Sequence, residues 1–154
     1  MKFLENNTVV WVNGTFDVLH RGHIELFKHA KSLGDFLIVG TDTDRRITQL
    51  KGKNRPINTL ENREAMLRSI RYIDIVTHYD SDTELRECIK MCSANIMVIG
   101  EDYIDKHIIG ADLFDKIVMN PSDSLSTDYV RSLDPEMYGQ ANTLKDRGYF
   151  QGKK

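Results

Sequence analysis

Two histidines stand three positions apart in the stretch GTFDVLHRGH, residues 14–23. An apolar run typical of a strand precedes them and a helical pattern follows, so both rings are expected on one side of the helix's first turn. Backbone amides and the positive end of the helix dipole favour an anion at such a turn. We therefore predict that His20 and His23 clamp a phosphate, the alternative being that His23 is a core histidine in register with Phe27 and Ala30.

A basic stretch, RRITQLKGKNRPINTLENR, follows at residues 45–63 and supplies further candidate cations. Taken alone, such a stretch is as often a solvated surface as a binding loop. Arg63 is more informative, because it falls on the apolar stripe of its predicted helix with Leu60 and Leu67. A guanidinium is not buried without a counter-charge. Arg63 is therefore expected to face either an internal carboxylate or a bound anion, and Arg71 either reads the same site or ends the helix.

Other residues that could do chemistry have simpler interpretations. Asp17 is expected to accept hydrogen bonds from backbone amides of a turn, with orientation of His20 or of a metal-bound water as the second option. Cys88 and Cys92 lie four positions apart on one helix face without a CxxC motif, which indicates small buried hydrophobes. A zinc site at the histidine pair would need a third ligand that the sequence does not offer. No protein-bound metal is predicted.

The elements that position these residues follow from the alternation of apolar runs and helical patterns. Strands are expected at 8–13, 35–41, 72–79, 95–100 and 115–120, and helices at 23–34, 83–92 and 126–133. Asn58 and Glu61 have the spacing of a capping box that opens one more helix ending near Arg71, and the basic stretch before it is expected to be a loop. Nearly continuous apolar strands separated by helices indicate a doubly wound parallel α/β sheet in a single domain.

Several classes of function are excluded or disfavoured. The first strand-to-helix turn lacks GxGxxG and the chain lacks GxxxxGK[ST], which disfavours a dinucleotide enzyme and a P-loop NTPase. A net charge of −2 over 154 residues, with both signs interspersed, gives no field for nucleic acid. The apolar runs are too short to cross a bilayer and no secretory segment is recognised, so we expect a cytoplasmic protein without a membrane partner.

The motifs GTFDVLHRGH, KGKNRPINTLENR and IGEDY together resemble the cytidylyltransferase-like nucleotidyltransferases, known by their HxGH motif. The similarity covers roughly residues 8–133 and implies a Rossmann-like nucleotidyltransferase domain over 1–133, with 134–154 as a polar C-terminal extension. It implies transfer of a nucleoside monophosphate from an NTP to a phosphorylated sugar or polyol, with release of pyrophosphate. It also implies Mg²⁺ accompanying the NTP, and a homodimer.

The resemblance assigns roles by position. The catalytic residues would be His20 and His23 on the triphosphate, Lys51 from the loop after the second strand, and Arg63. The expected nucleotide-binding residues are Gly14, Thr15, Phe16, Asp17, Gly22, Gly100, Asp102, Ser126 and Thr127, and the expected substrate-binding residues are Arg55 and Arg71.

The sequence resembles two branches of the family, which differ in their substrates. LKGKNRPINTLENR, GEDY and IIGADLF are most similar to the adenylyltransferase domain of ADP-heptose synthase, which uses ATP and a sugar 1-phosphate. GTFD and RYIDIV are also similar to glycerol-3-phosphate cytidylyltransferase, which uses CTP. Both branches carry Ser-Thr-Thr where this chain has Asp128 after Ser126 and Thr127. The resulting negative charge makes a non-catalytic nucleotide-binding module the third alternative.

Overall fold

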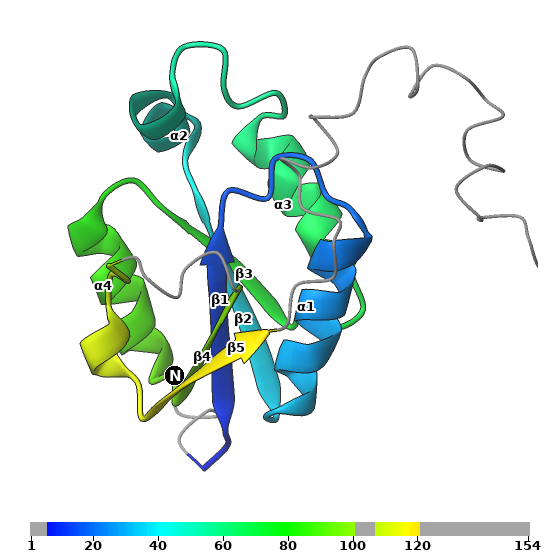
Figure 1. Ribbon diagram of the computed structural model, residues 1–154, viewed down its shortest axis with the longest axis vertical. Helices are drawn as coiled ribbons and strands as arrows, with labels where there is room; N and C mark the ends of the chain where they lie inside the picture. Colours follow the sequence, from blue (N-terminus) through cyan, green and yellow to red (C-terminus); the bar gives the residue numbers. More distant parts are fainter. Residues whose placement is uncertain (1–5, 101–106, 121–154) are drawn as a thin grey trace, which may run out of the picture.

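A sheet of parallel strands forms the centre of the molecule (Figure 1). The computed structural model describes residues 6–100 and 107–120, and within them the strand order is β3-β2-β1-β4-β5. The strands are β1 Val9–Gly14, β2 Phe36–Asp42, β3 Ile75–Tyr79, β4 Ile96–Gly100 and β5 Lys116–Asn120. The helices are α1 Arg21–Ser32, α2 Asp44–Lys51, α3 Leu60–Arg68 and α4 Asp82–Cys92, with a short 3-10 helix, η3, at Ala111–Leu113.

Both faces of the sheet are covered. Along β1, Val9 and Trp11 point into an apolar cluster with α4, whereas Val10 and Val12 point into a second cluster with α1 and α3. All four side chains are buried, because successive residues of a strand face opposite sides. This arrangement explains the uninterrupted apolar strands of the sequence and confirms the predicted doubly wound fold (Figure 1).

The strand order reverses beside β1, which marks the position of a ligand site. The chain passes from β1 to β2 to β3 on one side, and β4 and β5 then lie on the other side of β1. In open α/β sheets, ligands bind beyond the carboxyl ends of the strands at such a reversal. The turn that leaves the carboxyl end of β1 contains His20 and leads into α1.

Close contact between β1 and β2 depends on a glycine. The indole of Trp11 lies over Gly40, where an added Cβ would be 2.6 Å from the indole Cζ2 and 3.0 Å from Tyr79 Cε1. The indole nitrogen donates to Asn13 Oδ1 over 2.8 Å. Gly40 thus allows two large rings to fill one face of the sheet.

The main difference from the predicted elements is α2. The stretch expected to be a basic loop contains an eight-residue helix, with Thr43 as its N-cap accepting from Arg46 N–H. The reason is that Ile47 is the helix's one buried residue, so the sequence shows almost no apolar periodicity there. Capping and ion pairs stabilise this helix instead of a packed apolar face.

Other boundaries differ by a few residues. The N-cap of α3 is Thr59, whose hydroxyl accepts from Asn62 N–H, so the predicted capping box at Asn58 and Glu61 is wrong. The Asn58 side chain instead contacts the β1–α1 turn, where its Nδ2 donates to Asp17 O. The third strand begins at Ile75 rather than at 72, and α1 begins at Arg21 rather than at 23. The predicted helix 126–133 and the domain boundary after 133 lie outside the described residues.

In the part of the chain that the structure describes, no helix has the length and apolar character needed to cross a membrane.

Replacing Gly40 by alanine tests the contact with Trp11 and Tyr79. We expect the unfolding free energy to fall by about 1–3 kcal/mol, because the added methyl group overpacks the site. Urea denaturation measures this loss. Gly100→Ala is the matched control, since no atom of the described residues lies within 4 Å of a Cβ there, and it should change stability by less than about 0.5 kcal/mol. Equal losses in the two variants would contradict the packing explanation.

Candidate active site

The turn between β1 and α1 has a strained backbone. Phe16 adopts a φ of +46°, a left-handed conformation that is rare for a bulky residue. Its ring packs edge-on against His23, with centroids 5.6 Å apart, and against Phe27 at 5.2 Å. A Cβ on Gly14 would lie 3.1 Å from the Phe16 ring, so the glycine leaves space for it. Aromatic packing thus holds the turn in a conformation that brings a ring against His23.

The two histidines cap the first turn of α1 reciprocally. The backbone N–H of Gly22 donates to His20 Nδ1 over 3.0 Å, and the N–H of His20 donates to His23 Nδ1 over 3.1 Å. The ring centroids are 4.0 Å apart. This is a capping box built from imidazoles. Because each Nδ1 is an acceptor, a neutral ring carries its proton on Nε2.

These caps change how an anion could be bound at α1. The amide of Gly22 donates to the His20 ring, and the amide of His23 donates to His20 O over 3.0 Å. The expectation that first-turn amides receive the anion is therefore wrong for these two groups. An anion at this end of α1 would meet the imidazole edges of His20 and His23 instead.

The environment of His23 favours its neutral form. Burial lowers the pKa of His23 to about 4, and repulsion from His20 adds to the shift. Near neutral pH the His23 ring is uncharged, so it acts as a hydrogen-bond donor rather than as a cation.

Asp17 fastens the loop before α3 to this turn. Its carboxylate is almost fully buried and accepts from Ile57 N–H and Asn58 N–H, both at 2.8 Å, and from Arg55 Nε at 3.1 Å. Burial raises the pKa of Asp17, but the hydrogen bonds from the two amides and from Arg55 outweigh it, so the pKa lies below its ordinary value. These contacts match the amide-capping interpretation of Asp17.

Arg63 connects three segments that surround the site. Its guanidinium is fully enclosed and donates to Thr15 O, Asn58 O and Asp42 O at 2.8–3.1 Å. Nη2 pairs with Asp44 Oδ1 at 2.7 Å. Of the two alternatives from the sequence, the structure shows the internal carboxylate. Arg63 thereby holds the β1–α1 turn, the start of α2 and the loop before α3 in fixed relation.

Lys51 comes to the same edge of the sheet from α2. It is the last residue of that helix, it is exposed, and its Nζ lies 3.5 Å from Thr15 Oγ1. The next residue, Gly52, has φ +101° with open space around it. The exposed residues Lys51 to Asn54 therefore form a projecting segment directly after α2.

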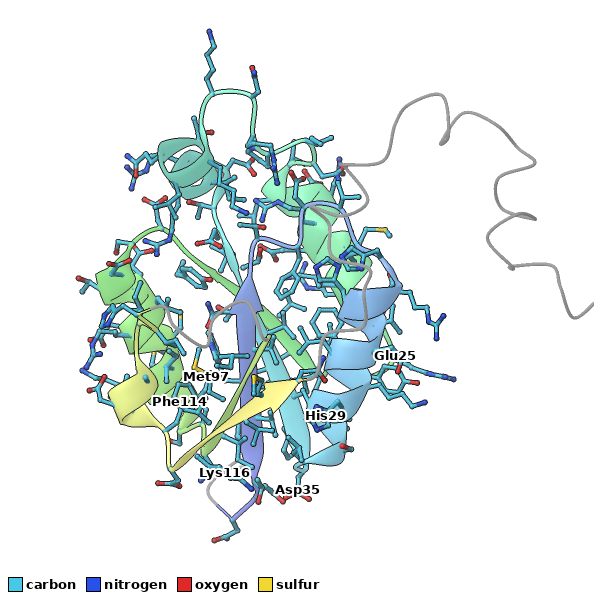
Figure 2. The ribbon with its side chains drawn as sticks, in the orientation of Figure 1. Glu25, His29, Asp35, Met97, Phe114 and Lys116 are labelled. Carbon is cyan, nitrogen blue, oxygen red and sulfur yellow. The ribbon has the colours of Figure 1, made fainter. Side chains whose placement is uncertain are left out.

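Ion pairs fix the start of α2 to two other elements. Arg46 Nε lies 2.7 Å from Asp42 Oδ1, and Arg46 Nη2 lies 2.7 Å from Asp82 Oδ1 on α4. Arg45 Nε lies 2.9 Å from Asp80 Oδ2, just after β3. Figure 2 shows the resulting concentration of nitrogen- and oxygen-tipped side chains above the carboxyl ends of β1 and β2.

The remaining predicted residues divide into three groups. Arg55 is near the site, held by Asp17, and Gly100 ends β4 beside β1. Arg71 is not brought to this edge, because it follows the carboxyl end of α3, precedes β3, and packs on Tyr72. Asp102, Ser126 and Thr127 lie outside the described residues.

A small cavity opens beside the turn. It has a volume of about 200 Å³ and is lined by Phe16, Asp17, Val18, Leu19, Asn58, Asn62, Arg63 and Met66. The cavity lies between the β1–α1 turn and α3, so both walls belong to segments that Arg63 ties together. Within the described ranges, no group of three or more metal-ligating side chains is found.

Sequence reasoning missed several supporting residues. Asp44 and Asn58 lie in the stretch expected to be a loop and a helix cap, yet they are the partners of Arg63 and Asp17. Thr41 Oγ1, at the end of β2, also accepts from Arg63 at 2.9 Å. A polar threonine at the end of an apolar strand was the available signal, since a buried hydroxyl needs a partner.

Comparison with known proteins shows the family of this chain. The cytidylyltransferase-like family model matches residues 11–131, which is most of the chain. The chain therefore belongs to the cytidylyltransferase-like family, as the HxGH motif predicted.

Curated relatives match most of this chain. Bifunctional protein HldE of Helicobacter hepaticus is 42% identical over 119 residues, covering 77% of this chain and 24% of that protein. HldE of a Marinomonas species is 44% identical over 109 residues, covering 71% and 23%. The chain thus spans about a quarter of the length of these curated relatives.

Solved structures share the fold. A lipopolysaccharide core biosynthesis protein from Thermoplasma volcanium is similar with a TM-score of 0.63 and 26% identity, covering 77% of this chain and 100% of that one. Pantothenate synthetase from Thermus thermophilus has a TM-score of 0.60 at 16% identity, covering 95% and 70%. At that identity, the second likeness concerns the fold alone.

Asp17→Asn tests the anchoring of the loop before α3. We expect the unfolding free energy at pH 7 to fall by about 1–3 kcal/mol, because buried amides lose a charged acceptor. The folded-state pKa of Asp17 is lowered, so its contribution is complete above the ordinary carboxyl pKa and is lost as the pH falls through the folded-state pKa. Urea denaturation across the acid range should show the two proteins converging.

Asp115→Asn is the control for this experiment, since Asp115 is exposed and its replacement should be nearly neutral. A constant difference between the wild type and Asp17→Asn at every pH would show that the charge of Asp17 does not stabilise the loop.

Proposed function

We propose that this chain transfers the nucleoside monophosphate of an NTP to a phosphorylated sugar or polyol and releases pyrophosphate. The preferred reaction is adenylyl transfer from ATP to a sugar 1-phosphate, as in ADP-heptose synthesis. The HldE relatives and the lipopolysaccharide core protein support this branch. The family likeness also supports a cytoplasmic homodimer as part of the proposal.

The observation that carries the proposal is the convergence of two imidazoles and one ammonium on a single turn. His20 and His23 lie at the start of α1 with Nδ1 turned to a backbone amide, so that Nε2 is the nitrogen that carries the proton in a neutral ring. Lys51 reaches Thr15 in the same turn. The turn lies where the strand order reverses. Hydrogen-bond donors and an exposed positive charge at this position fit a polyphosphate.

The proposed chemistry needs no protein nucleophile. An oxygen of the acceptor phosphate attacks the α-phosphorus in line, forming a new P–O bond while the bond to the α–β bridging oxygen breaks. The electron pair leaves with pyrophosphate. Catalysis then consists of positioning two anions and stabilising charge on the leaving oxygens.

The side chains divide this work in the proposed mechanism. His20 and His23 donate to the leaving phosphates, and Lys51 neutralises charge near the α-phosphate. Arg63 and Asp17 act on the site through other residues, because their polar atoms are engaged within the protein. They are positioning residues in the ligand-free chain.

Magnesium fits this site only together with the nucleotide. In residues 6–100 and 107–120, no cluster of carboxylates and imidazoles could hold a metal ion, and the Asp17 carboxylate is occupied by amides and Arg55. Mg²⁺ commonly binds through substrate phosphates and retains several waters. When bound, it would offset phosphate charge.

A substrate panel tests the proposed function. Purified chain is incubated with Mg²⁺ and each of ATP, CTP, GTP and UTP, combined with sugar 1-phosphates and with glycerol 3-phosphate, and pyrophosphate release is measured. We expect release with ATP and a sugar 1-phosphate. Turnover with CTP and glycerol 3-phosphate would establish the other branch, and nucleotide binding without turnover in any combination would establish the non-catalytic module.

Lys51→Ala tests the role of the α2 terminus. We expect kcat with the preferred pair to fall by about 10²–10³, the usual loss for one transition-state donor, while the unfolding free energy changes by less than about 0.5 kcal/mol because the side chain is exposed. Lys53→Ala, two residues further on in the same exposed segment, is the charge-matched control. Similar losses in both variants would indicate a general electrostatic effect, and lost stability would assign Lys51 a structural role.

A further inference from the structure

We infer that His20 and His23 meet the phosphate chain as uncharged imidazoles that each donate Nε2–H, and that protonating either ring opens the first turn of α1 instead of strengthening the clamp. The identity of the anion rests on the proposed function. The protonation state and tautomer of the rings do not, because the fold of the chain itself determines them.

Both caps of the α1 turn use a ring nitrogen as the acceptor. His20 Nδ1 accepts from Gly22 N–H, and His23 Nδ1 accepts from His20 N–H. An imidazolium has N–H groups at both ring nitrogens and no acceptor. A protonated ring would therefore point a donor at a backbone donor, and the amide would lose its partner. Charge on either ring is thus coupled to loss of a helix cap.

Packing around His23 also favours the uncharged ring. The edge-on contact of Phe16, whose ring also packs on Phe27, excludes water from one side of the imidazole. Burial and the neighbouring His20 lower the pKa of His23 to about 4. The strained φ of Phe16 therefore serves to keep His23 both oriented and neutral.

Among the described residues, charged groups on the surrounding elements do not reverse the preference of His23 for the neutral form. They are Arg21 and Glu25 of α1, Asp17 of the turn, Lys51 of α2 and Arg63 of α3. The nearest carboxylate in the turn, Asp17, is directed to Arg55 and two amides. Glu25 is exposed and lies on the outer side of α1, where it is labelled in Figure 2. The positive charge needed by a triphosphate thus comes from Lys51, while the imidazoles supply direction.

Nuclear magnetic resonance of the nucleotide-free chain measures the tautomer directly. Long-range ¹H–¹⁵N correlation of histidine-labelled protein distinguishes Nδ1 from Nε2 and reports protonation, and single substitutions assign the signals. We expect both rings to carry the proton on Nε2, and His23 to remain neutral through about pH 5.5. Titration of His23 near the ordinary pKa of about 6.5, or a proton on Nδ1 of either ring, would overturn the inference whatever the enzyme's reaction is.

Two substitutions of His23 separate the cap from the donor. Asparagine places an acceptor near the former Nδ1 but nothing at Nε2, whereas alanine removes both the cap and the donor. We expect His23→Asn to keep its Tm within about 1 °C, and His23→Ala to lose about 2–4 °C, as a lost cap predicts. With inorganic tripolyphosphate as the probe, both variants should weaken binding about tenfold or more.

The outcomes distinguish the two proposals. A loss of Tm in His23→Asn as large as that in His23→Ala, or an unchanged tripolyphosphate affinity in His23→Asn, would overturn the division between capping Nδ1 and donating Nε2. If the resonance data show the Nε2 tautomer but tripolyphosphate neither binds nor shifts the Nε2 signals, the inference about the phosphate clamp fails together with the proposed function. The Nε2 tautomer of the rings and their binding to phosphate can therefore each be refuted by experiment.

Discussion

The geometry of the site depends on the burial of one guanidinium. Removing Arg63 from water costs several kcal/mol unless its donors are satisfied, and the chain satisfies them with carbonyls from the turn, from the end of β2 and from the loop before α3, together with the Asp44 carboxylate. Each acceptor belongs to a segment that also carries or adjoins a site residue. The requirement that a buried charge be paired therefore fixes loops that have little apolar surface of their own.

Much of the fold could be predicted because both faces of the sheet are buried. Continuous apolar strands and amphipathic helices leave a clear period in the sequence, and β1, β2 and β4 with α1 and α4 were located within a few residues. The two features that were predicted wrongly, α2 and the N-cap of α3, share a cause. α2 buries Ile47 alone. The N-cap of α3 is Thr59 rather than Asn58, whose side chain contacts Asp17 in the β1–α1 turn. Elements stabilised by specific polar contacts have no periodic pattern to read.

The site was predictable in its composition and less so in its contacts. Spacing placed His20 and His23 on one turn, and the family motif added Lys51. Spacing could not show that each ring would use one nitrogen as a helix cap, since this depends on the backbone conformation of the turn. For Arg63 the sequence left open an internal carboxylate or an anion, and only tertiary structure could decide, because Asp44 lies nineteen positions away in the chain.

The way α2 is attached has a consequence for how the protein responds to its solvent. Arg45 and Arg46 bind this helix to Asp80, just after β3, and to Asp82 on α4. Arg45 and Asp82 are exposed, whereas apolar packing holds the sheet. Added electrolyte weakens exposed charge pairs but leaves burial of hydrocarbon intact or strengthens it. Concentrated salt should therefore loosen α2, which carries Lys51, while the rest of the molecule remains folded. Ionic composition and thermal stress would thus act on different parts of one domain.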